Sequence, residues 1–197
     1  MMRNSIIALP LIALVACGGQ STVPEDHYYR LPSPEVASKG AALTDGTIFV
    51  EQFIADGIHH ERALVYADAA APSELLQYHY HFWTDSPSRL LRDHFVDYLR
   101  SANAGRMITD SPEVPAELSI YGKIKRLDQI VNSSTAEVVA EVEFRVQKAG
   151  SDAPVLVRQY ERTVAVQDRS MEAAVGAFGS ALSGIYAQLV DDIAASH

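Results

Sequence analysis

Two long segments in the second half of the chain alternate apolar and polar residues with a period of two, and this pattern constrains the fold more than any other. Residues 116–131 place Leu118 and Ile120 on one side, and residues 135–148 repeat the alternation with Val142 and Phe144. Successive side chains of a strand point to opposite faces, so each segment predicts a long strand with one buried and one solvated face. The turn residues 132–134 then join the two strands as an antiparallel pair.

A third segment, residues 155–166, extends this pair into an antiparallel meander, with a turn at residues 149–152. Its apolar residues change parity between Val157 and Tyr160. One inserted residue reverses the side on which the following side chains point, and we therefore expect a β-bulge at this place.

Two other segments have helical periodicity. The first begins at Pro87, behind Asp85 or Ser86 as N-cap, and ends near Gly105; the second runs from a cap at Ser170 to about residue 194. Each carries an apolar stripe at spacings of three and four, which predicts one buried face: Leu91, Phe95, Tyr98, Leu99 and Ala102 in the first, and Val175, Phe178, Leu182, Ile185 and Leu189 in the second.

Shorter apolar runs in the first half predict the remaining strands: an edge strand at residues 28–31, core strands at 47–53, 63–66 and 77–83, and a short strand at 106–109. Helices with one apolar face must be buried against a sheet. The chain is therefore expected to form a single two-layer α/β (α+β) domain, in which two helices cover a mixed sheet that contains the antiparallel meander.

Composition agrees with one globular domain and limits its partners. The chain has 197 residues, 48% of them hydrophobic, which is enough for a sizeable core. Its formal net charge is -9, so it lacks the basic surface that neutralises phosphates. Nucleic acid is therefore an unfavourable partner.

The N-terminus predicts a lipid anchor. Arg3 precedes an apolar segment, residues 5–16, that has the length of a signal peptide and is short for a membrane span. The segment ends in Leu-Val-Ala-Cys, which resembles the bacterial lipobox and contains the sole cysteine, Cys17. The predicted organisation is a signal peptide at 1–16, an acylated Cys17 with a flexible tether through residue 27, and a domain at 28–197. The alternatives are a signal peptide with an incidental cysteine, or a retained membrane helix.

Acylation of Cys17 would leave the mature domain without a thiol, so it could form no disulfide and offer no thiolate. The residues after Cys17 are Gly18 and Gly19, so the chain lacks the Asp that tends to retain lipoproteins in the inner membrane. This favours the periplasmic face of the outer membrane over the inner membrane.

The aromatic strand at residues 77–83 is the most distinctive candidate site. Strand alternation places Tyr78 and Tyr80 on one face, and His79, His81 and Trp83 on the other. Two histidines on one face could bind a metal ion, but no carboxylate follows until Asp85. A contact role is favoured, with Tyr78, Tyr80 and Trp83 as candidate partner or oligomer contacts.

Small residues recur every four positions along the second helix, at Gly176, Ser180 and Gly184. Such a strip permits close backbone approach, either to the sheet or to a neighbouring subunit. The same three residues are therefore candidate contacts.

No motif of a hydrolase, P-loop protein, dinucleotide-binding protein or zinc protease occurs. Glu141 and Glu143 lie on the polar side of a regular strand, where solvated carboxylates are common. His59 and His60 lie beside Gly57 and charged residues, which is typical of an exposed loop. We expect no catalytic residues, no metal site and no cofactor.

Several segments together resemble the ABC-type transport auxiliary lipoproteins, a family that includes the lipoprotein of the paraquat-inducible transport system. They are Tyr28–Leu31, Ile48–Val50, Leu64–Tyr66, Gln77–Trp83, Asp85–Pro87 and the final helix rich in small residues. The resemblance implies a fold like the TolB N-terminal domain and a lipoprotein tied to the outer membrane. It also implies an MCE-type substrate-binding partner that carries phospholipid between membranes, with an ABC permease and ATPase completing the system. Only the acylated Cys17 transfers as a functional position.

Two other functions remain open on the residues alone. One is an adaptor in outer-membrane assembly, with a TolB-like or LptE-like role. The other is a periplasmic metal-dependent hydrolase that uses His79, His81 and a carboxylate. Self-assembly into a homo-oligomer is compatible with the lipid-transport hypothesis.

Overall fold

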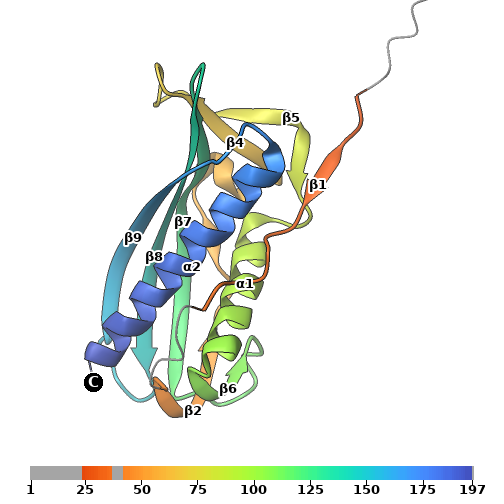
Figure 1. Cartoon of the computed structure of the whole chain (residues 1–197). Helices are drawn as coiled ribbons and strands as arrows, with labels where there is room; N and C mark the ends of the chain where they lie inside the picture. The colour runs from red at the N-terminus through yellow and green to blue at the C-terminus, as the bar shows by residue number, and fades with distance from the viewer. Residues whose placement is uncertain (1–23, 37–41, 197) are drawn as a thin grey trace, which may run out of the picture.

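The computed structural model describes residues 24–36 and 42–196, and within them two helices lie on one face of a mixed sheet (Figure 1). The predicted signal peptide, Cys17 and the tether through Val23 lie outside the described residues. The described strands are β1 His27–Tyr29, β2 Thr44–Val50, β3 Ile54–Ala55, β4 Ala63–Asp68, β5 Leu76–Trp83, β6 Gly105–Thr109, β7 Leu118–Val131, β8 Ala136–Lys148 and β9 Leu156–Ala165. The helices are α1 Pro87–Ala102 and α2 Met171–Ala195, with a short 3-10 helix, η1, at Gly57–His60.

Strand β7 is the central strand of the sheet. One of its edges pairs antiparallel with β8 along nearly its whole length, and β8 pairs antiparallel with β9. The other edge takes three parallel partners in succession, β2, β3 and β4. Beyond these, β6 lies parallel to β2, while β5 and β1 extend the sheet past β4. The predicted mixed sheet with an antiparallel meander is therefore confirmed.

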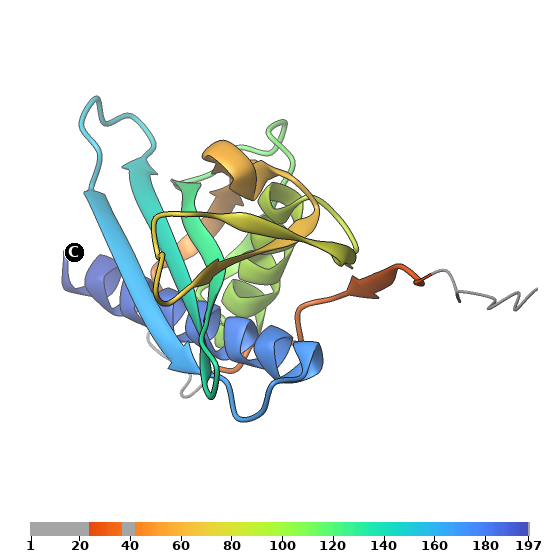
Figure 2. The same cartoon turned by 90° about the horizontal axis from the view of Figure 1, so that it is seen from above.

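Both helices cover the same face of the sheet, as the view from above shows (Figure 2). The inward side chains of β7 and β8 are buried there, and every residue of the two predicted apolar stripes is buried against them. Aromatic rings fill the centre: Phe144 contacts Phe53, Phe95 and Tyr186 at centroid distances of 5.4–6.4 Å. The core thus lies between one sheet face and the helix pair, as the stripes predict.

Helix termini follow their predicted signals with one shift. Helix α1 begins at Pro87 and ends at Ala102, where Asn103 adopts the left-handed conformation with φ 53°. Asn103, rather than Gly105, therefore ends the helix. Helix α2 begins behind Ser170, whose hydroxyl accepts a hydrogen bond from the Ala173 N–H at 3.1 Å. The side chain of Ser86, in contrast, makes no cap hydrogen bond.

The expected bulge in the third meander strand is wrong. Strands β8 and β9 pair without interruption from Glu137 opposite Ala165 to Val146 opposite Leu156. Val157 lies on the outer face of the sheet with 58% of its surface exposed, which accounts for the change in parity. The irregularity lies in β7, between Ile124 and Arg126, and it turns Asp128 toward the outer face beneath η1.

Helix α2 has the length and hydropathy of a membrane span: 25 residues, with a mean hydropathy of 1.4 over its most apolar window. Two thirds of that window is buried inside the domain. The apolar character of α2 is therefore explained by its place in the core.

Candidate interaction surfaces

Strand β5 does not alternate as a regular strand should. Gln77 of β5 pairs with Val65 of β4, and Phe82 pairs with Ala63. Five positions along β5 therefore correspond to only two positions along β4. This large bulge brings Tyr78 and His81 into edge-to-face contact at 5.6 Å between ring centroids. The predicted separation of tyrosines and histidines onto opposite faces is therefore wrong at this point.

The two candidate tyrosines of β5 occupy different environments. The ring of Tyr78 packs on Tyr66 at 4.4 Å, and its hydroxyl donates a hydrogen bond to Gln129 Oε1 at 2.8 Å. Burial raises the pKa of the Tyr78 hydroxyl. Tyr80 is 42% exposed and is free to contact another molecule. Of the two, Tyr80 is the surface residue.

Trp83 is a core residue, which corrects its assignment as a contact residue. Its side chain is 1% exposed and packs edge-on against Phe178 of α2, at 5.6 Å between ring centroids. Trp83 is the last residue of β5, and its contact with α2 places it inside the domain. Trp83 therefore joins strand to helix and cannot contact a partner in this structure.

His79 and His81 lie in different surroundings. His79 is exposed, whereas His81 lies against Tyr29, with 2.8 Å between the Tyr29 hydroxyl and His81 Nδ1. Among residues 24–36 and 42–196, no three side chains of His, Cys, Asp or Glu are grouped as metal ligands. The hydrolase reading therefore gains no support from the geometry.

His59 is buried, and its assignment to an exposed loop is wrong. Helix η1 folds over the outer face of the sheet and places His59 Nε2 3.8 Å from Asp128 Oδ1, with His59 only 5% exposed. Asp128 is itself paired with Arg126 at 2.9 Å. Burial lowers the pKa of His59 more strongly than Asp128 raises it, so the ring is neutral at pH 7. The bulge in β7 creates this site, and the sequence carries no separate signal for it.

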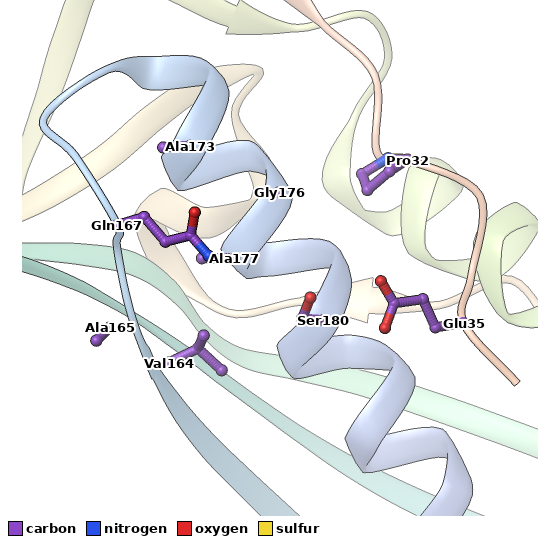
Figure 3. A pocket seen from close by; sticks show the side chains of 9 residues that line it. All are labelled: Pro32, Glu35, Val164, Ala165, Gln167, Ala173, Gly176, Ala177 and Ser180. Atoms are coloured by element: carbon purple, nitrogen blue, oxygen red, sulfur yellow. The ribbon is translucent and has the colours of Figure 1, made fainter. Parts of the chain in front are cut away.

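The small-residue strip of α2 is only partly available. A side chain at Gly184 would meet the Arg162 guanidinium at 2.7 Å, whereas nothing lies within 4 Å of a Cβ built at Gly176. Ser180 is exposed. Gly176 and Ser180 line a groove of about 340 Å³ that runs over α2, between residues 32–35 on one side and the end of β9 on the other (Figure 3). Its lining residues are Pro32, Glu35, Val164, Ala165, Gln167, Ala173, Gly176, Ala177 and Ser180.

One wall of this groove belongs to the segment at residues 27–36, which we call the strap. The strap comprises β1 and the following chain, and it crosses the helix pair before β2 begins (Figure 1). His94 Nε2 of α1 donates to the Pro32 carbonyl at 3.0 Å, and Ser183 Oγ of α2 accepts from the Glu35 N–H at 3.0 Å. The sequence predicts an edge strand and a loop here; it does not predict that the loop is held by both helices.

Comparison with solved structures supports the fold. Protein XCC0632 from Xanthomonas campestris, of the DUF330 family, is similar with a TM-score of 0.72 and 16% identity, over 86% of this chain and 96% of that one. A crystal structure of an uncharacterized protein is similar with a TM-score of 0.71 and 15% identity, over 86% and 99% of the two chains. A comparison with curated protein sequences found no match.

The family model described as the ABC-type transport auxiliary lipoprotein component matches residues 29–194. The match begins at the last residue of β1 and ends in the last turn of α2, so it includes the sheet, both helices and the groove. The chain therefore belongs to the family of ABC-type transport auxiliary lipoprotein components.

Proposed function

We propose that this protein is a non-enzymatic lipoprotein subunit of an MCE/ABC-type transport system that moves phospholipid or another lipid between the inner and outer membranes. The observation that carries this proposal is the family match over residues 29–194, behind a lipobox-like Cys17. Its partners would be an MCE-domain protein and, through it, an ABC permease and ATPase. Transport would in this way maintain the integrity of the envelope.

Acylation of Cys17 would hold the domain near one membrane. His27 is ten positions after Cys17, and an extended chain of this length reaches roughly 35 Å. Several acyl chains bind a bilayer far more firmly than the marginal hold of one. Because no Asp follows Cys17, we place the anchor in the outer membrane, with the domain facing the periplasm.

The groove over α2 is the surface that we assign to partner contact. Its floor has no large side chain, so the backbone of another protein can approach α2 closely at Gly176 and Ser180. Glu35, Gln167 and Ser180 supply polar groups along the rim. The occupant would be the MCE protein or a further copy of this chain, and exposed Tyr80 offers a second contact.

Mild crosslinking in cells, followed by isolation of the full-length lipoprotein, tests the proposal. We expect to recover an MCE protein, and we expect Gly176→Leu with Ser180→Leu to reduce that recovery about tenfold or more, as loss of a central interface contact does. Gln188→Leu is the matched control, because Gln188 is an exposed residue of the same helix outside the groove. Recovery of β-barrel assembly proteins alone would overturn the proposal in favour of the assembly adaptor.

A further inference from the structure

The strap connects the anchor side of the chain to the body of the domain, and two histidines of the body hold it. His81 of β5 contacts β1 at the start of the strap, and His94 of α1 contacts Pro32 further along. The strap is also held by the pairing of β1 with β5 and by the Glu35 N–H bond to Ser183. Among these contacts the two histidine rings are the groups whose ordinary pKa lies near neutral pH, so they can make the hold depend on pH.

At the first attachment, His81 is surrounded by aromatic groups. Its Nδ1 can accept a hydrogen bond from the Tyr29 hydroxyl only while that nitrogen is unprotonated. His27 of the strap stacks on the same ring at 5.3 Å with 17° between planes, and Tyr78 lies edge-on. Burial and then His27 lower the pKa of His81, and Glu172 of α2 opposes them. Protonation would reverse the direction of the Tyr29 bond, with Nδ1 donating to the hydroxyl oxygen, and it would place a charge on a partly buried ring stacked against His27.

At the second attachment, the tautomer of His94 follows from its partner. A carbonyl oxygen can only accept, so Nε2 carries the hydrogen that bonds Pro32. Nδ1 is then bare, and it is buried without a hydrogen-bond partner in the described structure. The ring is 6% exposed and packs on Tyr186 of α2. A second proton would enter at Nδ1, where no acceptor meets it.

The groups around His94 do not make its protonated form favourable. Burial lowers the pKa of His94, and the Pro32 carbonyl and Asp97, one turn along α1, oppose it without cancelling it. When the strap leaves, both rings regain water and take up protons more readily. By linkage, the open strap is favoured as pH falls below the ordinary histidine pKa of about 6.5.

We propose that the strap is an acid-sensitive latch: neutral His81 and His94 hold residues 27–36 on the domain, and protonation of the two rings releases them. Release would free the surface of α2 at Gly179, where Pro32 now packs so closely that no side chain would fit. It would also remove the Pro32–Glu35 wall of the groove. If Cys17 is acylated as proposed above, the tether would lengthen from a reach of roughly 35 Å to roughly 65 Å.

Hydrogen exchange of the full chain in detergent micelles, measured by mass spectrometry at pH 7.5 and 5.5, tests the latch. After correction for the intrinsic exchange rate, we expect peptides from the strap to exchange at least about tenfold faster at pH 5.5. Each ring contributes a factor that approaches ten for every unit by which its pKa rises on release once the pH lies below both values, and the factors of the two rings multiply. Peptides from β7 and β8 serve as the internal reference. Equal corrected rates for the strap at the two pH values would overturn the proposal.

Matched variants assign the effect to the two rings. His94→Gln keeps an N–H donor for Pro32, and His81→Gln keeps an acceptor for Tyr29, but neither side chain titrates in this range. The double variant should exchange its strap at the same corrected rate at both pH values, whereas exposed His79→Gln should respond as the wild type does. A full pH response in the double variant would show that other groups control the strap.

A second measurement tests the proposal even if the strap of the double variant no longer binds to the domain at either pH. The ring protons of His81 and His94 in the wild-type protein can be titrated by NMR. Midpoints below the ordinary histidine pKa of about 6.5 support the latch, and midpoints at or above it contradict the latch whatever the variants do.

Discussion

The roles of several single residues in this domain follow from the side chains that surround them. The alternation of residues 116–131 correctly places Gly122 on the inward side of β7, but it does not say why glycine stands there. In the structure the ring of Phe53 lies where a side chain would be, 2.6 Å from a Cβ built at Gly122. Trp83 is similar: its position in an aromatic run indicates a surface, and only the packing of α2 places it in the core.

Gly122→Ala is therefore expected to destabilise the protein by about 1–3 kcal/mol, because Phe53 must leave its place against Phe144. Gly176→Ala is the matched control. A Cβ at Gly176 meets nothing within 4 Å, and alanine is favoured over glycine within a helix by roughly 0.5–1 kcal/mol. Urea unfolding of the two variants should move the midpoint in opposite directions, and a shift in the same direction would contradict this reading.

At the scale of elements, local sequence signals predict where most helices and strands begin and end. The alternation of β7 and β8 and the stripes of α1 and α2 are periodic over many residues, and these elements form as predicted. The failures come where tertiary contacts override the local pattern. Strand β5 bulges because its aromatic residues pack on both β4 and β1, and η1 is drawn over Asp128 so that His59 becomes buried.

The two predicted helix caps differ in a way that can be measured. Ser170 accepts from the Ala173 N–H, whereas the Ser86 side chain makes no such bond. Ser170→Ala should lower the free energy of unfolding by about 1 kcal/mol, the usual effect of losing a cap. Ser86→Ala should change it by less than about half of that, since no cap bond is lost. Chemical denaturation measures both changes, and equal decreases in the free energy of unfolding would show that both hydroxyls cap their helices.

At the scale of the whole molecule, the sequence predicts the fold class but not the order of strands. Alternation specifies which face of a strand is buried, and it says nothing of which distant strand lies alongside. The parallel pairings of β2, β3 and β4 with β7 join segments many residues apart, and no local signal encodes them. The groove and the strap follow from that arrangement, so they could not be predicted either.

Global stability should fall as the solution is made acidic. His59 and His94 are buried, and burial lowers the pKa of each. The unfolded chain binds protons at these residues near pH 6.5 while the folded chain does not, so the free energy of unfolding declines below that pH. Urea midpoints at pH 7.5, 6.5 and 5.5 measure this decline. The double variant His59→Gln with His94→Gln should decline less steeply, and an unchanged slope would exclude the two rings as its cause.

The central place of β7 also limits how early in folding the sheet can be completed. Strands β2, β3 and β4 are made early in the chain, but each needs β7, which begins only at Leu118. A chain that emerges from its N-terminus therefore exposes three unpaired strand edges until more than half of it is available. Such nonlocal pairing slows folding and leaves strands open to misassembly in the meantime. The native sheet can therefore be completed only once β7 is available.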